Sequence, residues 1–361
     1  MDSSYVGTFD RQILGLFQNA LKLGVRDPRM MAFLYRANRW QKRAVQVRAK
    51  WEEQGVHVPP FVIASVTRRC NLHCKGCYAR AQQRSQEPEL TPAQLRGILA
   101  EARELGVSIV LLAGGEPLTR PGILDICADC PEITFPLFTN GLLIDDEMIA
   151  RFRRQRNIVP VISLEGLQSQ TDDRRGDGVY QHLLGIMRKL KEQGIFFGTS
   201  LTVTRLNYET VYSREYMQER IDAGSQLFFF VEYVPVQPGT EPLVLTDEQR
   251  EGQSQRLAQF RQELPGLFVA LPGDEEQFGG CLAAGRGFIH ISPEGRLEPC
   301  PFAPYSDTSL KTMSLREALQ SEFLKQIRGS SHHLTETQGG CALWAQRDWV
   351  QSLLSTPEMV G

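Results

Sequence analysis

From Phe61 to Pro235 the chain alternates short apolar runs with longer amphipathic segments, and this alternation is what most restricts its fold. Near-continuous apolar runs predict strands buried on both faces, which occur in parallel sheets covered by helices. The expected strands are 61–66, 108–113, 133–138, 158–163, 196–203 and 227–234. Six such units predict an α/β fold in the form of an open or partial barrel, with functional loops at the C-terminal ends of the strands.

Two further regions flank this alternation. Residues 1–58 predict helices, because apolar residues recur at helical spacing and the pattern breaks at Asp27-Pro28 and at Val58-Pro59-Pro60. Beyond residue 236 the predicted elements are a helix over 246–264 with Thr246 as its N-cap, a hairpin over 287–299 and a helix over 314–328. The expected divisions are a helical extension (1–58), a barrel (59–236) and a C-terminal region (237–361).

Composition and charge exclude several classes of protein. The 361 residues are 42% hydrophobic and 23% charged, so the chain can bury a large core and is not disordered as a whole. The formal net charge of −2 gives no reason to expect nucleic-acid binding. No stretch approaches the ~18 uninterrupted apolar residues of a membrane span. Because the first ten residues are acidic and precede no apolar run, we expect a cytoplasmic protein.

Eight cysteines are spaced unevenly, which favours metal ligation over a disulfide scaffold in a chain of this length. Cys70, Cys74 and Cys77 form a CxxxCxxC pattern directly after the first expected strand. Three thiolates on one loop can bind three irons of a cubane cluster and leave the fourth iron open to a substrate or cofactor. The alternatives are structural zinc, with His73 as a possible fourth ligand, or plain core thiols.

From this loop onward the sequence resembles the radical SAM family. Ala113-Gly114-Gly115-Glu116-Pro117 resembles the family's GGE motif at the end of the second strand. The motifs that end the next two strands, and the Arg-Gly that follows, are Thr139-Asn140-Gly141, Ser163-Leu164-Glu165-Gly166 and Arg174-Arg175-Gly176. The order of these motifs around CxxxCxxC makes the resemblance specific, and it covers roughly residues 61–235.

The resemblance implies an enzyme that binds a 4Fe-4S cluster and S-adenosylmethionine (SAM). Reductive cleavage of SAM would give a 5′-deoxyadenosyl radical that abstracts hydrogen from a substrate. The residues implied in cofactor binding are Tyr78, Gly114, Gly115, Glu116, Asn140, Ser163, Glu165 and Arg175. The resemblance further assigns the methionine ammonium to Glu116 and nearby carbonyls, its carboxylate to Ser163 and Arg175, and the ribose hydroxyls to Glu165.

Some of these assignments have structural alternatives. Glu165 can be a solvated loop carboxylate, and Arg175 can form a surface salt bridge. Many family members carry an aromatic residue near the adenine, just before the third cysteine. Here that position is Gly76, and we expect Tyr78 to substitute. Glu232 and Tyr233, at the end of the sixth strand, are expected to reach adenine or substrate, with a barrel-end ion pair as the alternative for Glu232.

Three further cysteines follow the barrel: Cys281, Cys300 and Cys341. With the hairpin between them they resemble the SPASM/twitch extension of radical SAM enzymes, which implies one auxiliary 4Fe-4S cluster. Trp344 stands where a fourth cysteine often lies, so either one iron is open or the ligand set is completed by His332, His333 or Asp348. The alternative is dispersed core thiols, which is also our interpretation of Cys127 and Cys130.

The resemblance implies oxidation, cyclisation or C–C or C–S bond formation on a peptide or small-molecule substrate. The rival function is a zinc-stabilised or iron–sulfur electron-transfer protein without turnover. The sequence shows no His–Ser–Asp constellation, so we expect no hydrolytic triad.

Two basic segments suggest partners. Residues 67–84 carry no acid, which favours docking of an acidic reductant such as flavodoxin or ferredoxin, or else a solvated loop; the basic residues there are Arg68, Arg69, Lys75, Arg80 and Arg84. Residues 26–50 carry eight basic residues against one acid. That segment is expected either to clamp the open edge of the barrel or to contact a membrane or an acidic partner.

Overall fold

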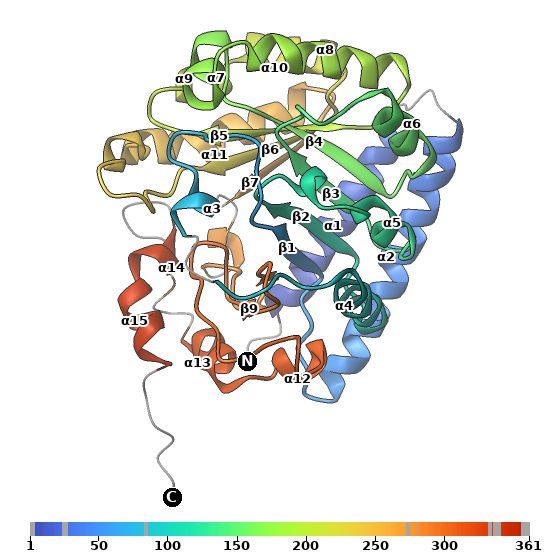
Figure 1. The fold of residues 1–361 in the computed structure, drawn as a ribbon, viewed down its shortest axis with the longest axis vertical. Helices are drawn as coiled ribbons and strands as arrows, with labels where there is room; N and C mark the ends of the chain where they lie inside the picture. Colours follow the sequence, from blue (N-terminus) through green and yellow to red (C-terminus); the bar gives the residue numbers. More distant parts are fainter. Residues whose placement is uncertain are drawn as a thin grey trace, which may run out of the picture.

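The computed structural model describes residues 4–23, 28–82, 86–271, 275–278, 280–330, 334 and 341–354. A nine-stranded sheet forms its centre, in the order β7-β6-β5-β4-β3-β2-β1-β8-β9 (Figure 1). All neighbouring strands from β7 to β8 are parallel, and β9 is antiparallel to β8. The strands are β1 (Phe61–Thr67), β2 (Ile109–Gly114), β3 (Phe135–Thr139), β4 (Ile158–Leu164), β5 (Gly198–Val203), β6 (Leu227–Glu232), β7 (Leu267–Leu271), β8 (Phe288–Ile291) and β9 (Leu297–Glu298).

The six strands expected from the sequence are present, and the partial α/β barrel is confirmed. Helices cover the outer face of the curved sheet (Figure 1). The helices that follow β1 to β6 are α3 (Tyr78–Ala81), α4 (Pro92–Leu105), α5 (Ile123–Ala128), α6 (Asp146–Arg154), α7 (Gln168–Arg175), α8 (Val179–Glu192), α9 (Tyr208–Val211), α10 (Arg214–Asp222) and α11 (Asp247–Glu263), with short 3-10 turns η1 (Pro117–Thr119) and η2 (Glu241–Leu243).

Strands from beyond residue 236 complete both edges of the sheet. On one edge β7, a strand that was not expected from the sequence, pairs with β6. On the other edge β8 pairs with β1 in the register Phe61↔Phe288 and Val62↔Ile289. The expected hairpin is present as β8 and β9. The C-terminal region is therefore continuous with the barrel sheet on both sides.

Side-chain caps explain where several helices begin. The Thr91 hydroxyl accepts a hydrogen bond from the Gln94 amide of α4, and the Thr246 hydroxyl accepts one from the Gln249 amide of α11. The single helix expected over 314–328 is wrong, because the Ser321 side chain caps a second helix there. The remaining C-terminal elements are η3 (Glu275–Phe278), α12 (Leu315–Ala318), α13 (Glu322–Gly329), α14 (Ala342–Ala345) and α15 (Arg347–Ser352).

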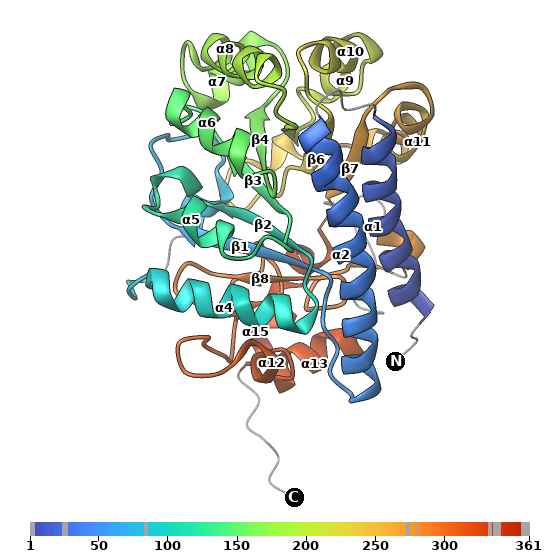
Figure 2. The same cartoon turned by 90° about the vertical axis from the view of Figure 1, so that its right-hand side faces the viewer.

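Two N-terminal helices, α1 (Ser4–Lys22) and α2 (Pro28–Glu53), lie side by side against the barrel (Figure 2). The apolar side of α2 packs on residues at or just before the beginnings of β4 to β7: Val159, Phe196, Leu227 and Leu267. Arg48 is buried, pairs with Asp10 at 2.5 Å and donates to the Gly106 carbonyl. Residues 26–50 were expected to clamp the open edge of the barrel, and α2 instead covers the beginnings of these strands. None of the described helices combines the length and the apolarity needed to cross a membrane.

Candidate cofactor and cluster site

A cavity of about 260 Å³ gathers the residues that the motifs single out. Its walls include the ends of β2, β3, β4 and β6, the cysteine loop after β1, and parts of the C-terminal region. All six expected ligand cysteines line it: Cys70, Cys74, Cys77, Cys281, Cys300 and Cys341. So do Tyr78, Gly114, Gly115, Glu116, Asn140, Ser163 and Arg175, whereas Glu165 does not. The fold thus brings together two cysteine sets more than 200 residues apart.

The cysteine loop lies directly against the end of β2. The Gly115 amide donates to the Thr67 carbonyl and the Glu116 amide donates to the Arg69 carbonyl, each at 2.7 Å. A Cβ atom on Gly114 would lie 2.5 Å from the Thr67 carbonyl oxygen, and one on Gly115 would clash with the Arg69 backbone. Both glycines therefore permit contact between two backbone segments, in addition to any approach to a ligand.

A second set of contacts holds the same loop from the side of α7. The Lys75 amide donates to the Arg174 carbonyl at 2.9 Å, and Arg174 Nε donates back to the Lys75 carbonyl at 3.1 Å. Glu165, at the end of β4, accepts from Arg174 at 2.7 Å and from Arg175 Nε at 2.9 Å. Burial lowers the pKa of Arg175, but the negative charges of the Glu165 carboxylate and of a Cys74 thiolate raise it more, so Arg175 stays charged. Glu165 thus lies outside the cavity and binds two arginines, Arg174 and Arg175, that line it.

Glu116 and Asn140 join the loop to the end of β3. Glu116 is buried and accepts from the Thr139 hydroxyl at 2.8 Å and from the Asn140 amide at 2.7 Å. Burial raises the pKa of Glu116, and the hydrogen bonds from Asn140, Leu118 and Thr139 oppose that rise. The Asn140 side chain donates to Asn71 at 2.8 Å and lies 3.9 Å from Cys70 Sγ. A donor beside a cluster thiolate is one way in which a protein sets a reduction potential.

The second cysteine set is buried together with a carboxylate. Burial is the largest cause that raises the pKa of Cys281, Cys300 and Cys341, the last to about 12. Glu275, from η3, lines the same cavity and is itself buried. Its charge adds to the rise in all three pKa values. Thiols buried in this way ionise only beside a compensating positive charge, such as that of a bound metal.

Of the other expected ligands for this set, Asp348 is exposed on α15, and His332 and His333 lie outside the described residues. His73, the fourth ligand of the zinc interpretation, is exposed and does not line the cavity. Within the described ranges, no three Cys, His, Asp or Glu side chains are gathered as one metal ion requires. A cubane cluster needs wider spacing, because each thiolate binds a different iron. The donor sets therefore fit clusters better than zinc.

Cys127 and Cys130 are buried away from this cavity. Cys127 lies in α5, and both belong to the main apolar core. The Asn157 side chain donates to the carbonyls of both residues, at 3.1 and 3.3 Å. Burial raises the pKa of each thiol, so neither is a reactive thiolate.

Two tyrosines, Tyr78 and Tyr233, lie near Gly76, the position at which many family members carry an aromatic residue. Gly76 has a φ of +64°, and a Cβ atom there would meet the ring and hydroxyl of Tyr233. The Tyr233 hydroxyl is buried without a hydrogen-bond partner among the described residues and lies at the cavity wall. Tyr78 packs on Phe302 with ring centroids 5.1 Å apart. Only Tyr78 was expected to substitute at this position, and no sequence pattern indicates the contact between Tyr233 and Gly76.

Three buried residues form a hydrogen-bonded chain that has no signal in the sequence. Ser65 Oγ lies 2.8 Å from His290 Nε2, and His290 Nδ1 lies 2.7 Å from Glu298. These side chains come from β1, β8 and β9, so strand pairing alone brings them together. None of the three lines the cavity. The chain therefore satisfies buried polar groups where the C-terminal region joins the barrel.

Comparison with known proteins identifies the class. Residues 64–214 match the family model described as "Radical SAM superfamily". The AdoMet-dependent heme synthase of Methanosarcina barkeri is 25% identical over 314 residues, which cover 80% of this chain and 88% of that relative. The mycofactocin maturase MftC of Mycobacterium tuberculosis is 25% identical over 316 residues, 80% of each chain.

A solved structure shares the fold of this chain. Streptococcus suis SuiB bound to S-adenosylmethionine superposes with a TM-score of 0.63 at 19% identity, covering 93% of this chain and 82% of that one. Through residues 64–214 this chain is assigned to the radical SAM superfamily. It is therefore an enzyme of the class that uses a 4Fe-4S cluster and SAM, and the rival of a protein without turnover is set aside.

The contact between Gly115 and Arg69 predicts that a side chain at position 115 impairs cluster binding. Gly115→Ala should displace the cysteine loop, because the new methyl group meets backbone rather than a flexible side chain. Iron content after anaerobic reconstitution should fall, and SAM binding should weaken. Gly97→Ala, in the exposed middle of α4 with nothing within 4 Å, is the matched control. It should keep its iron and gain about 0.5–1 kcal/mol of stability. Equal iron content in the two variants would contradict this account of the loop.

Proposed function

We propose that this chain cleaves SAM reductively and uses the resulting radical to abstract hydrogen from a bound peptide or small molecule, leading to oxidation, cyclisation or C–C or C–S bond formation. The observation that carries this proposal is the single cavity lined by both cysteine sets and by the residues of four strand-end motifs. Relatives named for heme synthesis, PqqA peptide cyclisation and mycofactocin maturation support both substrate classes.

In this proposal Cys70, Cys74 and Cys77 hold the SAM-binding cluster. When bound, that cluster supplies the electron that cleaves SAM and the open iron that chelates it. Ser163 and Arg175 face the methionine carboxylate, and the Glu165 carboxylate keeps Arg175 charged and oriented. Glu116 holds the end of β3 against the loop and offers its remaining lone pairs to the methionine ammonium.

The rest of the cavity wall indicates what kind of group reacts. Much of it is apolar, with side chains from β1, β2, β3, β7 and β8: Phe61, Ile63, Leu111, Phe138, Leu271 and Phe288. Glu232, at the end of β6, is neutralised by an ion pair with Arg250 at 2.7 Å. We therefore expect the reacting part of the substrate to be an apolar side chain or ring substituent, because an unpaired charge would be desolvated without compensation.

The proposed cleavage predicts different outcomes for one cysteine of each set. Cys74→Ala should abolish 5′-deoxyadenosine formation under dithionite, because it removes a ligand of the SAM-binding cluster. Cys300→Ala should retain some uncoupled cleavage, because its cluster is not where SAM binds. Chromatography of the reaction mixture measures the nucleoside directly. Complete loss in a Cys300→Ala protein that keeps about four irons would mean that the two sites do not act separately.

We further propose that Glu275 is the fourth protein ligand of an auxiliary cluster held by Cys281, Cys300 and Cys341. Its support is position: Glu275 is buried in the cavity wall that these cysteines share, whereas Asp348 is exposed. A carboxylate ligand would close the cluster and favour electron transfer over direct substrate binding.

Two matched carboxylate variants test the ligand. Glu275→Gln should change the electron paramagnetic resonance spectrum of the reduced auxiliary cluster in a protein whose SAM-binding cysteines are replaced by alanine. Asp348→Asn should leave that spectrum unchanged. Both variants keep side-chain volume and remove one charge. An unchanged spectrum in Glu275→Gln, or a changed one in Asp348→Asn, would contradict the assignment.

The basic loop supports a docking proposal for an acidic reductant. Arg69 and Arg80 are exposed and have no ion pair within the described ranges. Two other basic residues of the loop are already paired, Arg68 with Glu294 at 3.1 Å and Lys75 with Asp173. Arg84 lies outside the described residues. The two unpaired arginines are close in sequence to the cluster ligands, so they are suited to steer an acidic flavodoxin or ferredoxin toward them.

Charge reversal tests the docking surface. The double variant Arg69→Glu, Arg80→Glu should slow flavodoxin-driven turnover, and that rate should depend less on salt than in the wild type, because exposed charges mainly set the association rate. Turnover driven by dithionite, which needs no docking surface, should change little. Equal losses with both reductants would indicate damage to the cluster loop and would contradict the proposal.

A further inference from the structure

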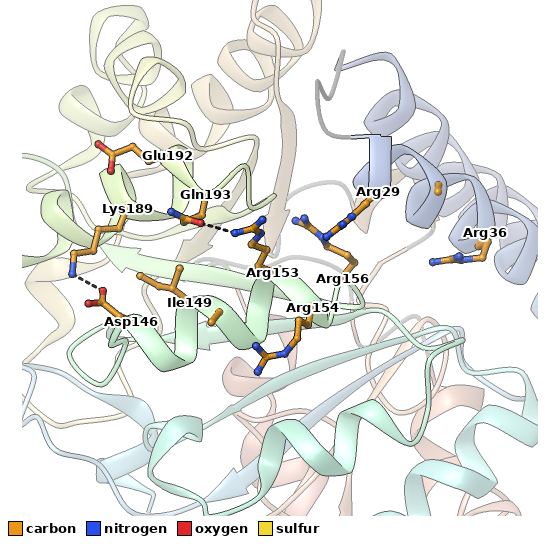
Figure 3. Close-up of a pocket in the computed structure, with 12 residues that line it drawn as sticks. Arg29, Arg36, Asp146, Ile149, Arg153, Arg154, Arg156, Lys189, Glu192 and Gln193 are labelled. Carbon is orange, nitrogen blue, oxygen red and sulfur yellow. Dashed lines mark hydrogen bonds and ion pairs between the residues drawn. The ribbon is translucent and has the colours of Figure 1, made fainter.

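A second pocket, of about 900 Å³, lies on the outer side of the barrel. It is formed by α6, the C-terminal end of α8 and the beginning of α2 (Figure 3). None of its lining residues belongs to the cavity that contains the cysteines. The site and function described above leave this pocket unexplained.

The pocket is strongly basic in a chain whose net charge is −2. Six basic side chains line it: Arg29, Arg36, Arg153, Arg154, Arg156 and Lys189. Only two carboxylates do so, Asp146 and Glu192, and Asp146 already pairs with Lys189 at 2.8 Å. No carboxylate in the described part of the chain pairs with Arg36 or Arg154. The gathered positive charges repel one another unless an anion lies between them.

Helix electrostatics account for only part of this charge. Arg153 and Arg154 end α6, where cations are favoured by the helix dipole. Arg29 lies in the first turn of the 26-residue helix α2, which has no acidic residue there, and at that end a cation is unfavourable. Arg36, two turns further on, also lines the pocket although α2 packs its apolar side on the barrel. Helix electrostatics therefore do not account for the presence of Arg36 in the pocket.

The arrangement identifies the chemistry of that ligand. Five of the six cations are arginines, whose planar guanidinium groups bind carboxylate or phosphate in a bidentate manner. Figure 3 shows the basic groups spread along the pocket from Lys189 at one end to Arg36 at the other, rather than focused on one point. The lining contains no aromatic side chain on which a nucleobase could stack. Spread charge and a volume of about 900 Å³ suit several linked anionic residues better than one phosphate group.

We propose that this pocket binds an acidic peptide segment, a run of Asp and Glu residues in a partner polypeptide. The carboxylates pair with Arg36 and Arg154, and the segment lies along α6. The partner is thereby anchored outside the barrel, apart from the cavity in which the reaction takes place. This inference goes beyond the proposed reaction and does not depend on its identity.

Binding of a fluorescein-labelled octapeptide of alternating Asp and Glu to the anaerobically reconstituted protein tests the proposal by fluorescence anisotropy. The wild type should bind saturably, and the double variant Arg36→Glu, Arg154→Glu should bind at least about tenfold more weakly. The control Arg39→Glu, Arg188→Glu makes the same change of charge at exposed positions on α2 and α8 that do not line the pocket. It should bind within about twofold of the wild type, since screened charges outside the contact contribute little.

Competition separates the peptide from other anions. Unlabelled peptide should displace the probe, whereas inorganic pyrophosphate at the same concentration should not. Three results would overturn the proposal: no saturable binding to the wild type, equal weakening in the two double variants, or displacement by pyrophosphate at a lower concentration than by peptide. Iron content and circular dichroism equal to the wild type establish that both variants are folded. A misfolded Arg36→Glu, Arg154→Glu protein is replaced by Arg36→Gln, Arg154→Gln, for which a several-fold loss is expected.

Discussion

The close contact between the cysteine loop and the end of β2 is the constraint on which the site depends. Two backbone hydrogen bonds of 2.7 Å tie Gly115 and Glu116 to the loop, and they form only because residues 114 and 115 lack side chains. On the other side, Lys75 and Arg174 exchange hydrogen bonds that the Glu165 carboxylate supports. The ligand cysteines are thus held between the end of β2 and α7 before any cluster is present, which lowers the entropy cost of cluster binding.

Strand pairing explains how a distant segment reaches the same cavity. Because β8 adds to β1 in parallel and β9 folds back on it, Cys300 follows directly from a strand of the barrel sheet. The buried contacts among Ser65, His290 and Glu298 fix this junction. The other edge is closed by β7, and η3 with Glu275 follows soon after it. Residues that follow the strands at both edges of the sheet therefore line one cavity.

Much of this arrangement could be predicted from the sequence, and the reason is topological. The C-terminal ends of parallel strands meet at one edge, so motifs that follow successive strands had to converge, as Glu116, Asn140 and Ser163 do. The unforeseen contacts depend on pairing between distant segments. Nothing near Leu267 or Phe288 in the sequence indicates that each joins an edge of the barrel sheet, and Glu275 and His290 follow from those pairings. Tyr233 was expected near the cofactor, but its contact with Gly76 requires the folded loop.

The central claim is that one cavity holds two clusters on two separate cysteine sets. The most direct measurement is the iron and sulfide content of three anaerobically reconstituted proteins: the wild type, the variant with Cys70, Cys74 and Cys77 replaced by alanine, and the variant with Cys281, Cys300 and Cys341 replaced. The account predicts about eight irons and eight sulfides in the wild type and about half of each in both variants. A wild-type content near four irons, or an unchanged content in the second variant, would contradict it.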